Sequence, residues 1–289
     1  MKIPTKKLKD GFAIPVYGLG TWQMGGRNER DLSNDDEADI KAIQTAIDLG
    51  VTHLDTAESY ADGYTEILLG KAIKDYDRSE LFIASKAHQD NLSYDDLINH
   101  CKASLKRLNT PYLDLYYCHR YNPTIPMKDT MRAMDTLLET GLIKNIGISN
   151  FNVERMKEAQ SETKHKIVVN QVHMNLKYRE PEKKGVLKYC QGNDVMFIAW
   201  RPTQKAELLD NVPLILDKVC KKYDKTPAQI AINWLIAQNN VVTLAKTTNL
   251  DHLKENLGAF GWMMETSDVE ELRNIYPDQE FVSNAVPID

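Results

Sequence analysis

Four side chains able to exchange protons follow three consecutive strand-like runs of this sequence. Asp55 and Tyr60 come just after a β-branched, apolar run. Lys86 closes the next run, and His119 follows the one after it. Taken singly, the lysine is typical of a solvated helix lead-in and the histidine of a hydrogen-bonded loop residue. An acid, a phenol, an ammonium and an imidazole at successive strand ends are poorly explained by independent coincidences, so we expect a site of acid–base chemistry.

These side chains need a scaffold that brings strand ends together. Short apolar runs alternate with segments of helical spacing along most of the chain. Strict alternation favours a parallel sheet, and eight such units favour closure into a (β/α)8 TIM barrel, an α/β fold, over an open sheet. Strands are expected at 16–19, 53–55, 81–85, 113–118, 143–148, 167–172, 195–200 and 241–244, and helices at 36–49, 94–108, 127–140, 153–161, 212–223 and 227–238.

Capping residues support several of these helices. A polar residue or a threonine–proline pair is expected at the start of a helix, and glycine is expected just past its end. The signals are Ser93 with Asp96, Asn150 with Glu154, Thr226 with Pro227, and the terminating Gly50 and Gly141.

Both ends of the chain fall outside the eightfold alternation. Asp10-Gly11 lies between two short alternating segments of residues 6–15, the signal for a tight type I′ hairpin. The segment after Ala245 is expected to form appended C-terminal helices. Length alone also allows two domains, but 289 residues fit one barrel, and no low-complexity linker divides them. We therefore expect a single domain over residues 1–289.

Composition limits the partners of the protein. A hydrophobic content of 42% and a charged content of 27% are ordinary for a globular protein with a sizeable core. A net charge of -5, with no block of five like charges, gives no footprint for nucleic acid or an anionic membrane. No apolar segment follows the basic start, so a cytoplasmic location is expected. The spacing of the cysteines indicates no metal site. All four are expected to be reduced and buried: Cys101, Cys118, Cys190 and Cys220.

Further polar and aromatic residues belong to the same expected rim. The carboxyl ends of barrel strands converge on one face, where α/β barrels carry out their chemistry. Tryptophans would ordinarily be core or rim aromatics, but the set as a whole is too polar for packing. In chain order, the rim also receives Trp22, Ser149, Asn150, Gln171, Trp200 and Lys246.

The motifs that carry these residues resemble those of the aldo-keto reductases, of the short-loop bacterial and archaeal type, nearly from end to end. The resemblance implies that the catalytic tetrad of that family falls on Asp55, Tyr60, Lys86 and His119, all intact. The matching segments are Gly18-Leu19-Gly20-Thr21-Trp22, Leu54-Asp55-Thr56-Ala57 with Tyr60, Glu66 and Gly70, Ser85-Lys86, Leu113-Asp114-Leu115-Tyr116 with His119, Ile146-Gly147-Ile148-Ser149-Asn150-Phe151, and Asn170-Gln171.

The implied chemistry is the reduction of aldehydes or ketones to alcohols. A carbonyl receives a hydride at carbon and a proton at oxygen, and a tyrosine with a pKa of about 10 is a poor acid near neutrality. Lys86 is expected to lower the pKa of Tyr60, and Asp55 to keep that lysine charged and oriented. His119 would hydrogen-bond the carbonyl oxygen and orient the substrate.

The hydride must come from a bound nicotinamide cofactor, since no side chain supplies one. The Rossmann fingerprint is absent, as is a P-loop. The resemblance implies that Ser149, Asn150 and Gln171 hold the carboxamide and that Trp200 stacks on the nicotinamide ring. It also places Thr21 and Trp22 beside the cofactor.

The segment after the last strand is implied to read the far end of the cofactor. Lys246 and Thr247 match the family pattern for a 2′-phosphate, while Glu255 and Asn256 match its acidic and amide positions. His252 stands where the family has a phosphate-binding arginine, and an imidazole cannot give the same bidentate, always charged contact. NADPH is therefore expected to be preferred, with the preference weakened and NADH also used. The alternative for His252 is an ordinary helix-surface residue.

Loops between these points are expected to complete the site. Arg201 or Lys205 would provide a counter-charge to the pyrophosphate. Trp22, with Tyr121 and Asn122, would line an apolar mouth that favours small carbonyl compounds.

Two other functions stay open alongside a monomeric reductase. One is a cofactor-sensing regulatory subunit of the same family. The other is a barrel isomerase or epimerase, which would need no nicotinamide.

Overall fold

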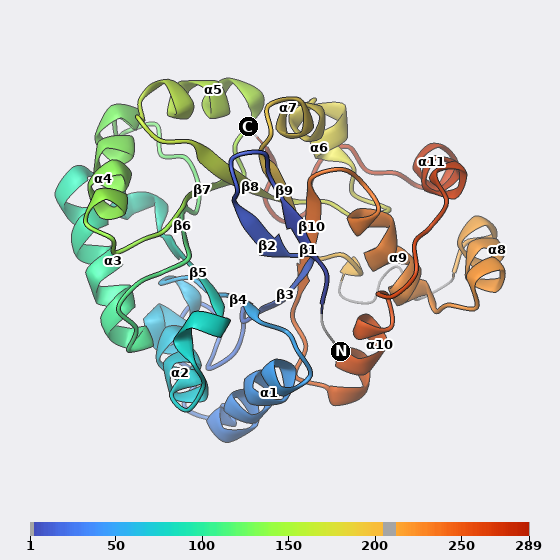
Figure 1. The fold of residues 1–289 in the computed structure, drawn as a ribbon, viewed down its shortest axis with the longest axis horizontal. Coiled ribbons are helices and arrows are strands. Elements are labelled where there is room, and N and C mark those ends of the chain that lie inside the picture. Colours follow the sequence, from blue (N-terminus) through green and yellow to red (C-terminus); the bar gives the residue numbers. More distant parts are fainter. Residues whose placement is uncertain (1–2, 205–211, 289) are drawn as a thin grey trace.

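The fold is a closed barrel of eight parallel strands, seen along its axis in the computed structural model of Figure 1. The structure describes residues 3–204 and 212–288. Neighbouring strands run in the order β10-β3-β4-β5-β6-β7-β8-β9. The predicted fold class is confirmed, and each expected strand is present within a few residues of its expected limits. The barrel strands are β3 (Tyr17–Gly20), β4 (His53–Asp55), β5 (Phe82–Ala87), β6 (Leu115–Cys118), β7 (Ile146–Ser149), β8 (Ile167–His173), β9 (Met196–Trp200) and β10 (Val241–Ala245).

Helices surround the barrel in Figure 1 and cover the outer faces of its strands. Because both faces of a parallel strand are covered, almost every residue of these strands is buried. In β8, all seven residues are buried. Helices α10 and α11 follow the last strand, as expected for the appended segment. The helices are α1 (Asp36–Asp48), α2 (Tyr64–Ile73), α3 (Tyr94–Leu108), α4 (Met127–Glu139), α5 (Val153–Ser161), α6 (Glu180–Lys183), α7 (Val186–Gly192), α8 (Leu214–Tyr223), α9 (Pro227–Ile236), α10 (Leu250–Leu257) and α11 (Thr266–Ile275), with short 3₁₀ turns η1 (Tyr60–Gly63), η2 (Arg78–Glu80) and η3 (Gln89–Asn91).

The N-terminal hairpin pairs β1 (Thr5–Lys7) with β2 (Ala13–Pro15) in antiparallel register. The predicted type I′ turn is wrong, because of the central residues only Gly11 has a positive φ, of 102°. Leu8 pairs with Phe12, and the Gly11 N–H donates to the Leu8 carbonyl, which makes a three-residue loop that ends in a glycine bulge. The hairpin crosses the middle of the barrel in Figure 1. Lys6 fixes it there through hydrogen bonds to three carbonyls before and at the start of β10, those of Ile236, Gln238 and Val241.

The capping signals are partly confirmed. Thr226 and Gln229 form a full capping box with Pro227 in the first turn of α9. Asn150 does not cap α5, because the cap is Asn152, whose side chain accepts from the Arg155 N–H. Asn150 lies instead on the barrel rim with a φ of 63°.

Ser93 begins α3 in extended conformation, but its hydroxyl donates to Asp96 rather than accepting from a helix amide. Gly50 and Gly141 follow α1 and α4 with positive φ, as expected for helix ends. All four cysteines are free thiols, and every one except Cys220 is buried. In the described part of the chain, no helix is both long and apolar enough to cross a membrane.

Candidate active site

A buried ion pair between neighbouring strands forms the centre of the site. Asp55 ends β4 and Lys86 lies on β5, and their Oδ1 and Nζ atoms are 2.5 Å apart. The exposed fractions of the two side chains are only 2% and 0%. Burial by itself lowers the pKa of Lys86, but the charges and hydrogen bonds of Asp55 and Tyr60 raise it above the ordinary value. The ammonium therefore keeps its proton in a water-poor environment.

Tyr60 extends from the turn after β4 toward the same ammonium. Its hydroxyl lies 3.4 Å from Lys86 Nζ, which also donates a 2.7 Å hydrogen bond to the Thr56 carbonyl. The chain leaves Tyr60 through two left-handed residues, Ala61 and Asp62, and the Ala61 N–H is held by the Arg27 carbonyl at 3.1 Å. Burial raises the pKa of Tyr60, and the charge of Lys86 opposes this rise without overcoming it. Lys86 thus lowers the pKa of Tyr60 as expected, but the larger effect of burial leaves that pKa above its ordinary value in the free protein.

His119 follows β6 and completes the predicted group. Its ring lies edge-on to that of Tyr60, with 5.9 Å between the centroids, and its Nδ1 is 3.5 Å from the Ser59 hydroxyl. Burial, together with the positive charges of Lys86 and Arg120, holds the pKa of His119 well below its usual range. A neutral imidazole can donate one N–H to an oxygen without carrying charge itself. The fold thus brings together all four residues selected from the sequence.

The amide-and-hydroxyl trio lies on β7, β8 and the turn between β7 and α5. The Ser149 hydroxyl donates to the Gln171 carbonyl at 2.9 Å, and Asn150 Nδ2 donates to Ser149 Oγ at 3.0 Å. Asn150 Oδ1 is buried and has no hydrogen-bond partner among the described residues. A buried acceptor without a donor is costly, which makes this oxygen a candidate ligand-binding atom. Gln171 Nε2 reaches Asp55 Oδ2 at 2.8 Å, so the trio is in contact with the ion pair.

Trp200 belongs to a column of stacked rings. Its ring lies 4.3 Å from that of His173, with 13° between their planes. The ring of Tyr178 also stacks on His173, with 4.9 Å between the centroids. The pKa of His173 is lowered to about 4, mainly by burial. Arg201 lies near two rings, 5.2 Å from Trp200 and 5.5 Å from Trp22. Sequence reasoning did not find His173, because a strand histidine carries no signal of its own.

Of the residues assigned to the far end of the cofactor, Lys246 and His252 are exposed, while Asn256 is buried and donates to the Tyr17 hydroxyl at 3.1 Å. Thr247 is half-buried and forms a turn with Asn249, the residue that caps α10. Glu255 is half-buried on α10.

Thr21 is fully buried and donates to the Asp55 carbonyl at 3.0 Å, so it joins the ends of β3 and β4. Lys205, expected as a counter-charge, lies outside the described residues.

Glu58, to which sequence reasoning assigned no role, joins two strand ends. Its Oε1 accepts from the His88 N–H at 2.6 Å and from Asn91 Nδ2 at 2.9 Å. Its Oε2 lies 2.7 Å from His100 Nδ1. The side chain is 6% exposed. A carboxylate two residues before Tyr60 therefore fixes the turn after β4 to the segment that follows Lys86.

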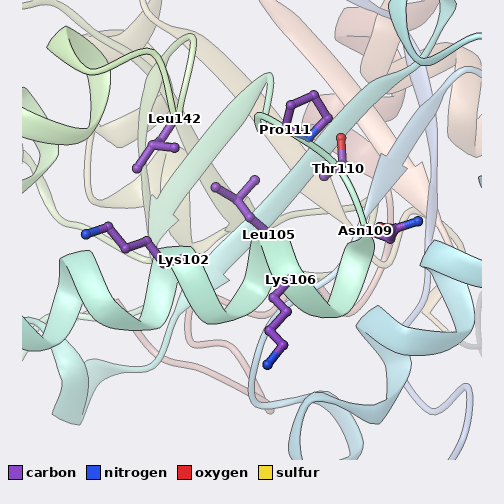
Figure 2. A pocket seen from close by; sticks show the side chains of 7 residues that line it. All are labelled: Lys102, Leu105, Lys106, Asn109, Thr110, Pro111 and Leu142. Carbon is purple, nitrogen blue, oxygen red and sulfur yellow. The ribbon is translucent and has the colours of Figure 1, made fainter.

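The hollow of about 520 Å³ shown in Figure 2 is separate from this group. It lies at the end of α3 and the loop that leads into β6, at the amino ends of the strands and opposite the tetrad. The hollow is lined by Lys102, Leu105, Lys106, Asn109, Thr110, Pro111 and Leu142.

Among residues 3–204 and 212–288, no group of three or more potential ligand side chains could hold a metal ion.

A closed barrel with polar side chains at the carboxyl ends of its strands is the architecture of a large class of enzymes. The model of the Aldo/keto reductase family matches residues 17–277, so the chain belongs to that family. The glyoxal reductase of Bacillus subtilis is 31% identical over 282 residues, which cover 97% of this chain and 95% of that protein.

Solved structures extend the similarity. The thermostable aldo-keto reductase Tm1743, in complex with the inhibitor epalrestat, aligns with a TM-score of 0.90 and 41% identity over 94% of this chain and 99% of that one. An aldo/keto reductase from Klebsiella pneumoniae, in complex with NADP and acetate, aligns with a TM-score of 0.85 and 28% identity over 99% of this chain and all of that one. The protein is an NAD(P)H-dependent oxidoreductase that acts on small carbonyl compounds.

Proposed function

We propose that the protein reduces small aldehydes and ketones to alcohols with Tyr60 as the proton donor and NADPH as the preferred cofactor. The observation that carries this proposal is the arrangement of the Tyr60 hydroxyl 3.4 Å from Lys86 Nζ, beside the 2.5 Å Lys86–Asp55 pair. The Bacillus relative is a glyoxal reductase, which supports a small carbonyl compound as the substrate. The bound NADP of the Klebsiella structure supports a phosphorylated cofactor.

Each member of the tetrad has a separate part in the proposed reaction. The Tyr60 hydroxyl donates its proton to the carbonyl oxygen, and the Lys86 ammonium stabilises the phenolate left behind. Asp55 keeps that ammonium charged and directed at the phenol. His119 is neutral and donates an N–H to the same carbonyl oxygen, which orients the substrate. Burial raises the pKa of Tyr60, so stabilisation by Lys86 matters most as the proton leaves.

The chain has residues that fit a nicotinamide. When bound, the cofactor supplies the hydride. Asn150 Oδ1, which has no hydrogen-bond partner among residues 3–204 and 212–288, would accept from the carboxamide, and Ser149 and Gln171 would complete the hydrogen bonds of that group. Trp200 would offer a ring face, and Arg201, Thr21 and Trp22 would lie along the cofactor. Lys246, Thr247, His252, Glu255 and Asn256 would hold the adenosine end, with NADH bound more weakly than NADPH.

The decisive experiment compares wild-type protein with Tyr60→Phe. Removing only the hydroxyl should lower kcat by about 10²–10⁴, the usual contribution of a general acid. The dissociation constant of NADPH, followed by quenching of tryptophan fluorescence, should stay within about twofold. Full turnover in this variant would disprove the role of Tyr60.

The same measurements separate the other functions. A cofactor-sensing regulatory subunit would bind NADPH without turning over any of a panel of aldehydes, ketones and sugars. An isomerase or epimerase would not respond to the cofactor. We further propose a single-domain, cytoplasmic monomer, for which size-exclusion chromatography should give a mass near 33.0 kDa.

A further inference from the structure

Nine of the ten arginines of this protein fall into two groups, and the tenth, Arg201, lies beside the rings of Trp22 and Trp200. Six lie within 4.0 Å of a carboxylate, as ordinary ion pairs do. Arg27, Arg120 and Arg155 have no carboxylate at that distance in the described part of the chain. The paired arginines are Arg30, Arg78, Arg107, Arg132, Arg179 and Arg273.

Two arginines of the second group, Arg27 and Arg120, belong to segments next to the proposed proton donor and its histidine. Arg27 is exposed, and its carbonyl accepts from the Ala61 N–H, one residue past Tyr60. Arg120 is exposed and directly follows His119. Its charge acts on both catalytic side chains, since it lowers the pKa of Tyr60 and of His119.

Aromatic rings hold two of these guanidinium groups. Arg27 lies 5.6 Å from the ring of Trp22, and Arg155 lies 4.0 Å from the ring of Tyr121, the residue after Arg120. Such contacts restrict a guanidinium while leaving its N–H groups available for an anion. Trp22 and Tyr121 are predicted from the sequence to line an apolar mouth of the site. Each of these rings has a guanidinium group beside it, so cations border that mouth.

The carboxylate of the tetrad is not available to neutralise them. Asp55 is buried, and both of its oxygens are already bound, to Lys86 and Gln171. The protein as a whole carries a net charge of -5, so this positive rim is a local feature. Guanidinium groups without carboxylate partners at a substrate entrance are suited to a planar or tetrahedral anion.

We propose that the preferred substrates of this reductase are small carbonyl compounds that carry an anionic group, a carboxylate or a phosphate, bound by Arg27, Arg120 and Arg155. The proposal rests on the proposed carbonyl reduction and specifies the substrate class of the same site. The anion remains at the rim while the carbonyl oxygen reaches Tyr60 and His119. No step of the reduction is altered, because the arginines bind and orient only.

Two matched pairs of substrates test this proposal with the wild-type protein and NADPH. Succinic semialdehyde is compared with its methyl ester, and glyceraldehyde 3-phosphate with glyceraldehyde. We expect kcat/KM to favour the charged member of at least one pair by about tenfold, the effect of one charge-assisted contact. The preference should shrink as salt is added, since exposed charges are screened. The pair that shows it identifies the anion as carboxylate or phosphate.

Single variants connect the preference to the rim. In Arg120→Gln and in Arg27→Gln, the ratio of kcat/KM between charged and neutral members should fall about tenfold. Arg132→Gln is the matched control, because that arginine lies on α4 and is paired with Asp129. In Arg132→Gln the ratio should not change. A general loss of activity would lower kcat/KM equally for the charged and the neutral substrate and would leave their ratio unchanged.

The possible failures are distinct. Equal kcat/KM for charged and neutral members in wild-type protein would overturn the anionic substrate class while leaving carbonyl reduction in place. A preference unchanged in both rim variants would overturn the role of the arginines. Turnover of none of the four compounds, with NADPH bound, would count against the proposed reduction itself.

Discussion

Gln171 Nε2 donates a 2.8 Å hydrogen bond to Asp55 Oδ2, while Asp55 Oδ1 receives Lys86 Nζ at 2.5 Å. One carboxylate therefore joins β8, which carries the expected carboxamide-binding glutamine, to β5, which carries the ammonium. Both oxygens of Asp55 are used, so the side chain has no freedom to rotate without breaking one of these bonds. The cofactor-binding side of the site and the proton-transfer side are thus held by a single group.

Asp55→Asn should shift the alkaline decline of the rate to a lower pH. The carboxylate is what raises the pKa of Lys86 against the effect of burial, so removing its charge should lower that pKa. Lys86 would then lose its proton as pH rises, and the alkaline limb of the kcat/KM profile should move down by about one pH unit or more. Asp62→Asn, an exposed residue of the following turn, is the control. An Asp55→Asn profile of unchanged shape would contradict the assigned role of Asp55.

Glu58→Ala should reduce both stability and turnover. The substitution leaves the His88 N–H and the Asn91 amide without their buried acceptor, which costs about 1–3 kcal/mol. A lower melting temperature is expected, together with a reduced kcat, because the turn that carries Tyr60 loses its tie to the segment after Lys86. Glu58→Gln keeps one acceptor and should recover part of both losses. Glu158→Ala, exposed on α5, should change neither, and a wild-type kcat in Glu58→Ala would remove Glu58 from the positioning of Tyr60.

The architecture and the tetrad could be predicted because they rest on periodic or locally distinctive patterns. The alternation of apolar runs and amphipathic helices defines the barrel, and strand ends such as Asp55 and Lys86 then have to converge. The hairpin loop could not be predicted correctly, because Asp10-Gly11 fits both a two-residue turn and a three-residue loop with a glycine bulge. The prediction that Asn150 caps a helix is wrong, because the true cap, Asn152, is the same residue type only two positions later.

Contacts between distant segments were beyond sequence reasoning. Nothing near Glu58 in the chain indicates that its oxygens accept from His88 and pair with His100. The direction of the net pKa shift of Tyr60 could not be predicted from the sequence either, because it depends on how far burial outweighs the charge of Lys86. The cationic rim also escaped notice, since it depends on which arginines find a carboxylate in three dimensions.

His252→Arg should strengthen the preference for NADPH over NADH. His252 is exposed in the first turn of α10, and Lys246, just after β10, is exposed as well. An arginine there would give a 2′-phosphate a permanent, bidentate partner, so the NADPH dissociation constant should fall about tenfold and that of NADH should not. Equilibrium fluorescence titration measures both. His165→Arg, which adds the same group before β8, serves as the control, and equal tightening of both cofactors by His252→Arg would place the phosphate elsewhere.

His53 should make the fold sensitive to acid. Its ring is fully buried between Gly18 of β3 and Phe82 of β5, and a Cβ on Gly18 would lie 2.5 Å from His53 Nδ1. Neither ring nitrogen has a hydrogen-bond partner in the described part of the chain, and burial lowers the pKa of His53 from 6.5 to about 4. Below pH 6.5 the unfolded chain therefore binds a proton that the folded chain does not, so the free energy of unfolding decreases as pH falls toward 4. The loss from this residue alone is about 3 kcal/mol.

Replacing His53 should flatten this dependence. Urea unfolding of His53→Leu between pH 7 and pH 4.5 should show a slope of stability against pH reduced by up to one proton, about 1.4 kcal/mol per pH unit. Met134→Leu, a buried change without a titrating group, should shift the whole curve and keep the wild-type slope. If His53→Leu keeps the slope as well, the acid sensitivity comes from other residues, of which His173 is the first to test because burial lowers its pKa to about 4.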